Sequence, residues 1–228
     1  MNLLAIETSA QICAAALFLE GHLAAECRTN LKNAHASVLF HQIETVLHMA
    51  KTTASELSAV AVSIGPGSFT GLRIGLAAAK GLALAREIPL IGVPSLEAMV
   101  WRLPPVDQTI YVLRKSRADE YYLADYRFIG GKPQSIGKIQ LLRGADLAAE
   151  FTGPCLIILD ADGEAVKLPE NCRVIPNFLP SAEAVGLAAL PRFAAGDFMD
   201  LDASEPFYLQ DFIAGKPRPL EATANAHT

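Results

Sequence analysis

Residues 65–75, with the sequence GPGSFTGLRIG, constrain the fold of this chain more than any other segment. They follow an apolar run at 57–64, where larger and smaller side chains alternate, and precede a proline-free segment rich in Ala and Leu at 76–86. We therefore expect a strand, a glycine-rich turn and a helix. Amides at the N-terminus of such a helix attract anions. The glycines fit neither the lysine-bearing phosphate loop nor the dinucleotide-binding pattern, so the turn alone is weak evidence for an anion site.

Small residues continue from this turn into the expected helix. Gly71, Gly75, Ala79 and Ala83 recur every four residues, which places them along one helix face. A face without large side chains lets another backbone approach closely. Two interpretations stay open: close packing on the chain's own sheet, or a helix-to-helix contact with another subunit.

The composition indicates a globular protein and argues against some functional classes. The chain has 228 residues, of which 51% are apolar and 19% are charged, as in a globular protein with one large domain or two small ones. The net charge of −5 argues against a protein that binds nucleic acid by itself, because affinity for the phosphate backbone comes mainly from Lys and Arg. The sequence shows neither a signal peptide nor an apolar run of transmembrane length, so we expect a cytoplasmic protein.

The four cysteines are scattered and form no Cys-x-x-Cys pair: Cys13, Cys27, Cys155 and Cys172. Such spacing predicts reduced thiols in a cytoplasmic protein and gives no zinc site.

The first hundred residues alternate between strand and helix patterns. Strands are expected at 3–6, 12–19, 23–28, 57–64 and 89–93, and helices at 34–51, 76–86 and from the expected N-cap Ser95 to 102. A three-stranded meander followed by alternating helices and strands is the order found in one half of actin-like proteins, ribonuclease H and sugar kinases. The predicted fold is α/β: an actin-like (ASKHA, ribonuclease H-like) arrangement of two subdomains with mixed sheets.

Two consecutive prolines at 104 and 105 predict a domain boundary. We expect an N-terminal actin-like subdomain at 1–103 and a smaller C-terminal α/β subdomain at 104–213. Within the second subdomain, strands are expected at 109–113, 120–128, 136–142 and 155–159, and helices at 146–151 and 182–195. The tail at 214–228 has nothing to bury and is expected to be disordered.

Several motifs together resemble a known family. They are Ile6-Glu7-Thr8-Ser9, His35-Ala36-Ser37, the run at 65–75, residues 79–83 and residues 92–98. These segments are similar to those of the bacterial TsaB (YeaZ) proteins, accessory subunits of the system that forms threonylcarbamoyladenosine beside the tRNA anticodon. The resemblance continues more loosely through 117–122, 161–163 and 206–209.

The resemblance implies a set of partners and no cofactor. The chain would dimerise with the catalytic TsaD-type paralogue, and a TsaE-type ATPase would join through the complex. An isolated chain would pair with itself, and contact with tRNA would be indirect. The expected partner interface lies on the first helix and on the small-residue stripe: His35, Leu39, Gly71, Gly75, Ala79 and Ala83.

The same resemblance predicts that the chain has lost its metal site. TsaD-type proteins carry a His-x-x-x-His pair just after a Gly-Val step, and the corresponding positions here are Ser95 and Met99. A hydroxyl group is a poor metal ligand, and a thioether is too soft for a hard ion beside phosphate oxygens. We therefore expect a non-catalytic subunit. The alternative is an active enzyme of the same fold, either an ATP-dependent phosphotransferase or a metal-dependent hydrolase.

Two further groups of polar residues are weaker candidates. Glu7, Thr8 and Ser9 stand where actin-like enzymes hold magnesium and phosphate, although Glu7 replaces the usual aspartate and a structural turn is the commoner role. Arg114, Lys115 and Arg117 form the densest basic cluster, at a position where the family has an Asp-Ala-Arg element. A solvated turn is the default expectation for this cluster, and an accessory contact with tRNA is the alternative.

Overall fold

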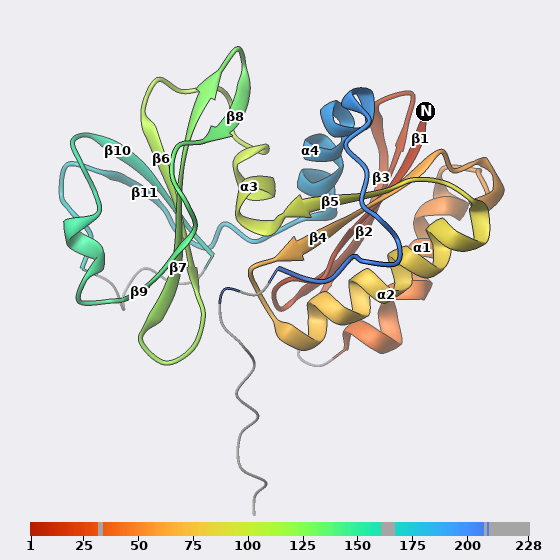
Figure 1. Ribbon diagram of the computed structural model, residues 1–228, viewed down its shortest axis with the longest axis horizontal. Helices are drawn as coiled ribbons and strands as arrows, with labels where there is room; N and C mark the ends of the chain where they lie inside the picture. The colour runs from red at the N-terminus through yellow and green to blue at the C-terminus, as the bar shows by residue number, and fades with distance from the viewer. Residues whose placement is uncertain (32–33, 161–166, 208, 210–228) are drawn as a thin grey trace, which may run out of the picture.

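The computed structural model describes residues 1–31, 34–160, 167–207 and 209, and the predicted disordered tail at 214–228 lies outside this range. Two β-sheets lie side by side, and a short helix, α3 (Ser95–Val100), stands between them (Figure 1). Among the described residues, no helix is long and apolar enough to cross a membrane.

The first sheet has the strand order β3-β2-β1-β4-β5. Its strands are β1 (Asn2–Glu7), β2 (Ile12–Leu19), β3 (His22–Asn30), β4 (Ala59–Gly65) and β5 (Leu90–Pro94). Strands β1 to β3 form an antiparallel meander, whereas β4 lies parallel to β1 and β5 parallel to β4. This mixed sheet confirms the predicted actin-like order.

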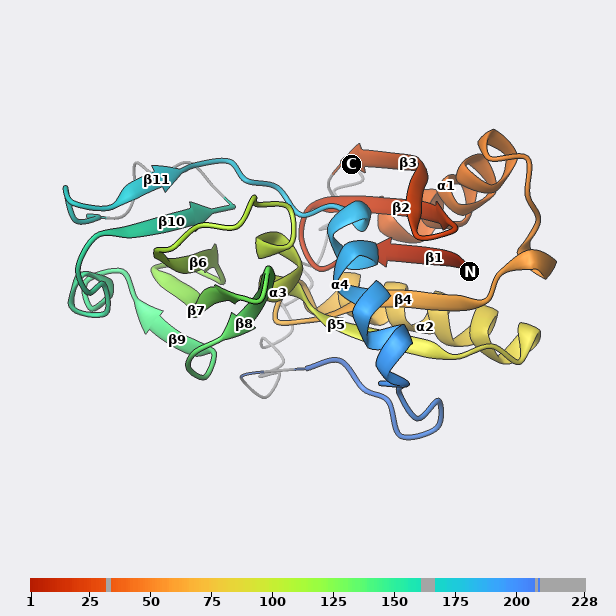
Figure 2. The ribbon, with the colours of Figure 1, turned by 90° about the horizontal axis from the view of Figure 1, so that it is seen from above.

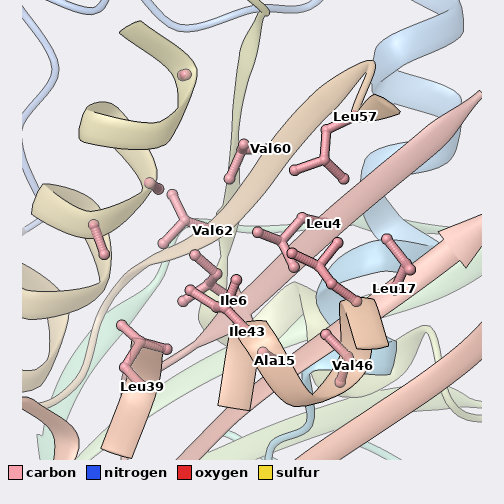
Figure 3. Close-up of a cluster of buried hydrophobic side chains, with 14 of the residues drawn as sticks. Leu4, Ile6, Ala15, Leu17, Leu39, Ile43, Val46, Leu57, Val60 and Val62 are labelled. Atoms are coloured by element: carbon pink, nitrogen blue, oxygen red, sulfur yellow. The ribbon is translucent and has the colours of Figure 1, made fainter. Parts of the chain in front are cut away.

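Successive side chains of each strand point to opposite faces of this sheet, so its hydrophobic core forms two layers. Leu4 and Ile6 point toward α1 (His35–Met49) and α2 (Phe69–Arg86), which share one face of the sheet (Figure 3). Leu3 and Ala5 point to the opposite face, which α4 (Ala182–Ala195) covers. Burying each large aliphatic side chain in these layers stabilises the fold by about 1.5–3 kcal/mol. Helices on both faces thus hold β1 rigidly in the middle of the sheet.

Helix α2 begins earlier than the sequence predicts. The expected start was near residue 76, but the helix starts at Phe69, and Ser68 caps it by accepting a hydrogen bond from the Gly71 amide at 3.2 Å. The expected turn is therefore partly helix, because close packing against β1 overrides the low helix propensity of Gly71 and Gly75.

The N-cap prediction for Ser95 is wrong. Helix α3 begins at Ser95 itself after the N-cap Pro94, and it ends at Val100 rather than at 102. The Ser95 hydroxyl instead accepts a hydrogen bond from the Gly65 amide at 3.0 Å, which ties α3 to the end of β4.

The second sheet has the order β11-β10-β6-β7-β8, and β9 also pairs with β7. Its strands are β6 (Thr109–Lys115), β7 (Glu120–Ile129), β8 (Lys132–Ser135), β9 (Gln140–Arg143), β10 (Cys155–Leu159) and β11 (Arg173–Ile175). Of the strand expected at 136–142 only the last residues are in a strand, β9, while β8 precedes the expected range. The helix expected at 146–151 is a single 3-10 turn, η2 (Leu147–Ala149). Strand β11 has too few residues to show a periodic pattern and was not predicted.

The chain returns to the first sheet after it completes the second. Helix α4 packs on β1 and β2, and residues 197–207 then run back beside β5, as Figure 2 shows. The Met199 amide donates to the Leu90 carbonyl at 2.8 Å, and the Phe207 amide donates to the Ile64 carbonyl at 2.7 Å. Residues after 104 therefore form the second sheet and also pack against the first sheet.

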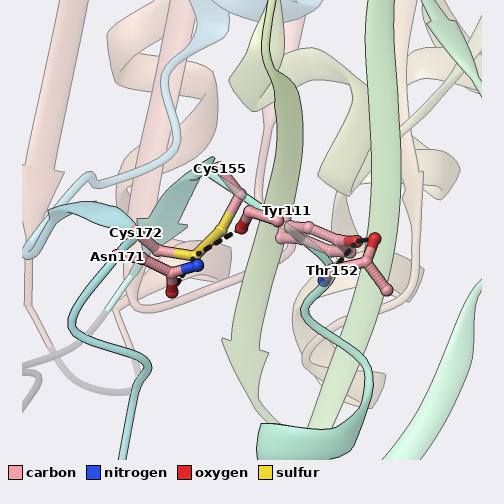
Figure 4. Close-up of a disulfide and its surroundings, with 6 residues drawn as sticks. Tyr111, Thr152, Cys155, Asn171 and Cys172 are labelled. Carbon is pink, nitrogen blue, oxygen red and sulfur yellow. Dashed lines mark hydrogen bonds between the residues drawn. A yellow bond between two sulfur atoms is a disulfide. The ribbon is translucent and has the colours of Figure 1, made fainter.

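The prediction of four reduced thiols is wrong for one pair. Cys155 and Cys172 form a disulfide (Figure 4), while Cys13 and Cys27 are free. Cys155 begins β10 and Cys172 directly precedes β11, and the parallel pairing of these strands brings the two residues together, with their Cα atoms 4.6 Å apart. The pairing of β10 with β11 is a tertiary feature and is not visible in cysteine spacing.

Candidate functional site

A cleft of about 790 Å³ opens between the two sheets, where β1, β4, β6 and β10 end. The turn after β1 and the start of α2 form one wall, and the ends of β6 and β10 form the other. Its polar lining residues include Ser9, Gln11, Asn30, Ser68, Thr70, Arg114, Lys115, Ser116, Arg117, Tyr122 and Asp160.

The turn that follows β1 is buried and internally bonded. Glu7, Thr8 and Ser9 are all buried, and of the three only Ser9 lines the cleft. Glu7 Oε1 accepts a hydrogen bond from the Ser9 amide, and the Ser9 carbonyl accepts one from the Ser68 amide at 2.7 Å. Burial raises the pKa of the Glu7 carboxyl, and the nearby Arg114 charge lowers it only in part. The turn thus fixes the start of α2 against the sheet.

The small-residue stripe of α2 faces this turn. A Cβ atom on Gly71 would overlap the Thr8 carbonyl oxygen, and one on Gly75 would overlap the Thr8 hydroxyl. Ala79 and Ala83 continue the stripe and are fully buried in the core of the first sheet. Of the two interpretations, close packing on the chain's own sheet is the one observed. The assignment of the stripe to a partner-facing surface is therefore corrected.

His35 and Leu39 of α1 are also buried in the chain itself. The Nε2 atom of His35 lies 3.0 Å from the Ala10 carbonyl and 3.2 Å from the Ile12 carbonyl. Two carbonyl acceptors require that this nitrogen carries a hydrogen and donates it. His35 thus holds the chain between β1 and β2 in place, and it lines the cleft while remaining buried.

Arg114 lies at the base of the cleft with a side chain that is 2% exposed. It donates from Nη1 to Ser9 Oγ at 2.9 Å and to the Pro66 carbonyl at 3.0 Å, and from Nε to Asp160 Oδ2 at 2.9 Å. Burial raises the pKa of Asp160, and Arg114 opposes that rise. The expectation of a solvated basic turn is therefore wrong for Arg114, whereas Lys115 and Arg117 are exposed.

Comparisons with known proteins agree with this architecture. A family model described as TsaD, tRNA N6-adenosine threonylcarbamoyltransferase, matches residues 29–189. The tRNA threonylcarbamoyladenosine biosynthesis protein TsaB of Escherichia coli is 28% identical over 96% of this chain and 99% of its own length. TsaB of Bacillus subtilis is 32% identical over 64% of each chain. The structure of YeaZ from Pseudomonas aeruginosa matches with a TM-score of 0.81 at 25% identity, over 91% of this chain and 99% of that one.

The chain belongs to the TsaB (YeaZ) family. Within this TsaB-family fold, Ser95 and Met99, where the sequence resemblance expects the histidine pair of TsaD-type proteins, are both fully buried. Ser95 uses its hydroxyl to accept from the Gly65 amide, and the Met99 sulfur lies 3.4 Å from Arg114 Nη2, which donates toward it. A cationic guanidinium thus stands beside the residues that would have to hold a cation.

Ser95 and Met99 do not fit a divalent metal. A thioether that contacts a guanidinium and a hydroxyl engaged with a backbone amide offer no suitable donor pair. Among the described residues, no group of three or more His, Cys, Asp or Glu side chains could hold a metal ion.

Asp160 is the cleft residue that sequence reasoning missed. It follows the expected strand at 155–159, as Arg114 follows the expected strand at 109–113. Strands β6 and β10 are parallel, with Leu113 opposite Leu159, so the next residue of each strand meets its counterpart. Knowledge of that strand pairing would have identified the ion pair.

Proposed function

We propose that this chain is a non-catalytic partner subunit required to form threonylcarbamoyladenosine on tRNA next to the anticodon. A relative that matches 96% of this chain carries the name of that biosynthetic system, which supports the pathway. The observation that carries the non-catalytic role is the contact between Arg114 and Met99. It puts a fixed positive charge at the position where the TsaD-type paralogue would bind its metal.

The proposed partner is the TsaD-type paralogue, and a TsaE-type ATPase joins through the complex. Because the stripe residues are buried, the proposed interface is the outer face of α1 and α2. Phe40 of α1 is 56% exposed and Leu84 of α2 is 70% exposed, which is unusual for large apolar side chains. Ala77 and Gly81 are exposed on α2 as well and leave its backbone accessible to another helix.

Cytoplasmic localisation and indirect contact with tRNA are part of the same proposal. Arg114 is buried and ion-paired, so it is not available to bind RNA phosphates. The side chain of Arg117 is 60% exposed but is paired with Glu120 at 3.0 Å. With a net charge of −5, the chain offers little attraction to RNA outside a complex.

Co-purification with the TsaD-type paralogue of the same genome tests the pairing. Leu84→Glu should weaken the complex by about tenfold or more in size-exclusion and calorimetric measurements, because a charge would be buried at an apolar contact. Ile129→Glu is the matched control, since Ile129 is 56% exposed but belongs to β7 of the second sheet. Equal binding by both variants would contradict the proposed interface.

The same two variants test whether the isolated chain pairs with itself through this face. If self-association is lost in Leu84→Glu and kept in Ile129→Glu, the homodimer and the heterodimer use the same surface of the chain. Turnover of ATP or of a hydrolase substrate by the purified chain, well above background, would instead favour the alternative of an active enzyme.

A further inference from the structure

Three oxygen atoms from separate parts of the chain surround the Arg114 guanidinium. They are Ser9 Oγ after β1, the Pro66 carbonyl oxygen after β4 and Asp160 Oδ2 after β10, at 2.9, 3.0 and 2.9 Å from its nitrogens. Of these, the carbonyl and carboxylate oxygens are ligands that hard divalent cations prefer. The guanidinium therefore fills a position with the donor chemistry of a cation site, and it does so from within the chain.

Two carboxyl groups lie near the same guanidinium. Asp160 is ion-paired with Arg114, and Glu7 lies close enough for the Arg114 charge to favour its ionised form. Glu7 is fully buried, and its Oε2 atom has no hydrogen-bond partner among the described residues. An ionised carboxylate in a site of low exposure requires a compensating cation, which Arg114 supplies to Asp160.

We propose that Arg114 is a permanent internal cation, which takes the place of a metal ion at the base of the cleft and excludes divalent cations from it. Its contacts join the first sheet, through Ser9 and Pro66, to the second sheet, through Asp160. A second cation within a few ångströms of the guanidinium would be repelled strongly in this buried site. Exclusion of the metal ion requires only these contacts and does not depend on whether the chain acts in tRNA modification.

Mn²⁺ titration of the full chain, followed by electron paramagnetic resonance, tests the exclusion. The wild-type chain should bind no Mn²⁺ in the cleft. Arg114→Gln removes the charge and frees the three oxygens, so it should bind about one Mn²⁺ per chain. Arg127→Gln removes one positive charge from the exposed side of β7 and should bind no more Mn²⁺ than wild type. Adding Asp160→Asn to Arg114→Gln should abolish the gain.

Two results would overturn the proposal. One is a folded Arg114→Gln variant that binds no Mn²⁺, because the guanidinium would then not be what excludes the ion. The other is wild-type binding of Mn²⁺ that Asp160→Asn removes, because the ion would then share the cleft with Arg114.

If Arg114→Gln does not fold, the proposal is tested by comparing the stability of the single and double variants. If Arg114 compensates Asp160, the double variant Arg114→Gln/Asp160→Asn should recover soluble, cooperatively unfolding protein that the single Arg114 variant loses. A double variant that is no better folded than Arg114→Gln would contradict the role of Arg114 as the compensating cation.

Discussion

Gly75 of α2 lies directly against Thr8 in the turn that follows β1, and a Cβ atom on Gly75 would overlap the Thr8 hydroxyl oxygen. Gly75→Ala should therefore destabilise the fold by about 1–3 kcal/mol, the usual cost of overpacking a tight core. Urea unfolding of the purified variant measures this cost.

Gly81 provides the control on the same helix, because nothing lies within 4 Å of a Cβ atom placed there. Gly81→Ala should stabilise the chain by about 0.5–1 kcal/mol, since alanine has the higher helix propensity. If both variants were equally stable, the close approach of α2 to Thr8 would not be what requires a glycine at 75.

The buried Glu7 carboxyl predicts a pH dependence of stability. Burial raises its pKa above the ordinary 4.5, so its contribution to stability is greatest in acid and is lost as pH rises through the folded-state pKa. Glu7→Gln cannot titrate and keeps an acceptor for the Ser9 amide. Its stability relative to wild type should therefore rise between about pH 4.5 and neutral pH, as measured by urea unfolding at several pH values.

The contribution of Glu56 to stability should change with pH in the opposite direction. Hydrogen bonds from Thr53 and Thr52 lower the pKa of this exposed carboxyl, so its contribution is present above its unfolded pKa and is lost as pH falls. Glu56→Gln should thus lose stability relative to wild type toward neutral pH. The same slope for both variants would mean that burial does not control the titration of Glu7.

Helices α3 and α4 are joined by a bidentate ion pair. Arg192 Nη2 donates to both oxygens of Glu97, at 2.9 and 2.8 Å, and the two side chains are only 26% and 18% exposed. Glu97→Gln should cost about 1.5–3 kcal/mol in urea unfolding, the range for a hydrogen bond to a charged group. Asp197→Asn removes the same charge from a partner of Arg192 that is 59% exposed and should cost less than about 1 kcal/mol.

The first sheet could be predicted because its signals are local. Alternation in β1, β2 and β4 and the helical period of α1 each lie within one segment, and no distant partner is needed to detect them. The sequence predicts too late a start for α2, because Gly71 and Gly75 have low helix propensity. Their helical state depends on a contact with Thr8, which is more than sixty residues earlier in the sequence.

The base of the cleft could not be predicted, because its residues meet only through tertiary structure. Arg114 was grouped with its sequence neighbours Lys115 and Arg117, although successive side chains of a strand point to opposite faces. Its ion-pair partner Asp160 is 46 residues away and becomes a neighbour only when β6 and β10 pair. The absence of the histidine pair at Ser95 and Met99 was visible in the sequence, whereas the cation beside those residues was not.

The disulfide between Cys155 and Cys172 predicts a stability that depends on reductant. It joins β10 to the start of β11 across a sequence separation of 17, for which the loss of chain entropy gives about 3 kcal/mol of stabilisation. A reducing agent should lower the unfolding midpoint of the wild-type chain and leave the midpoint of Cys172→Ser unchanged.

Before reduction, alkylation should reach the half-buried Cys27 before Cys13, because burial raises the pKa of the Cys13 thiol to about 12. Four reactive thiols in protein purified without reductant would contradict the disulfide and restore the expectation drawn from the cysteine spacing.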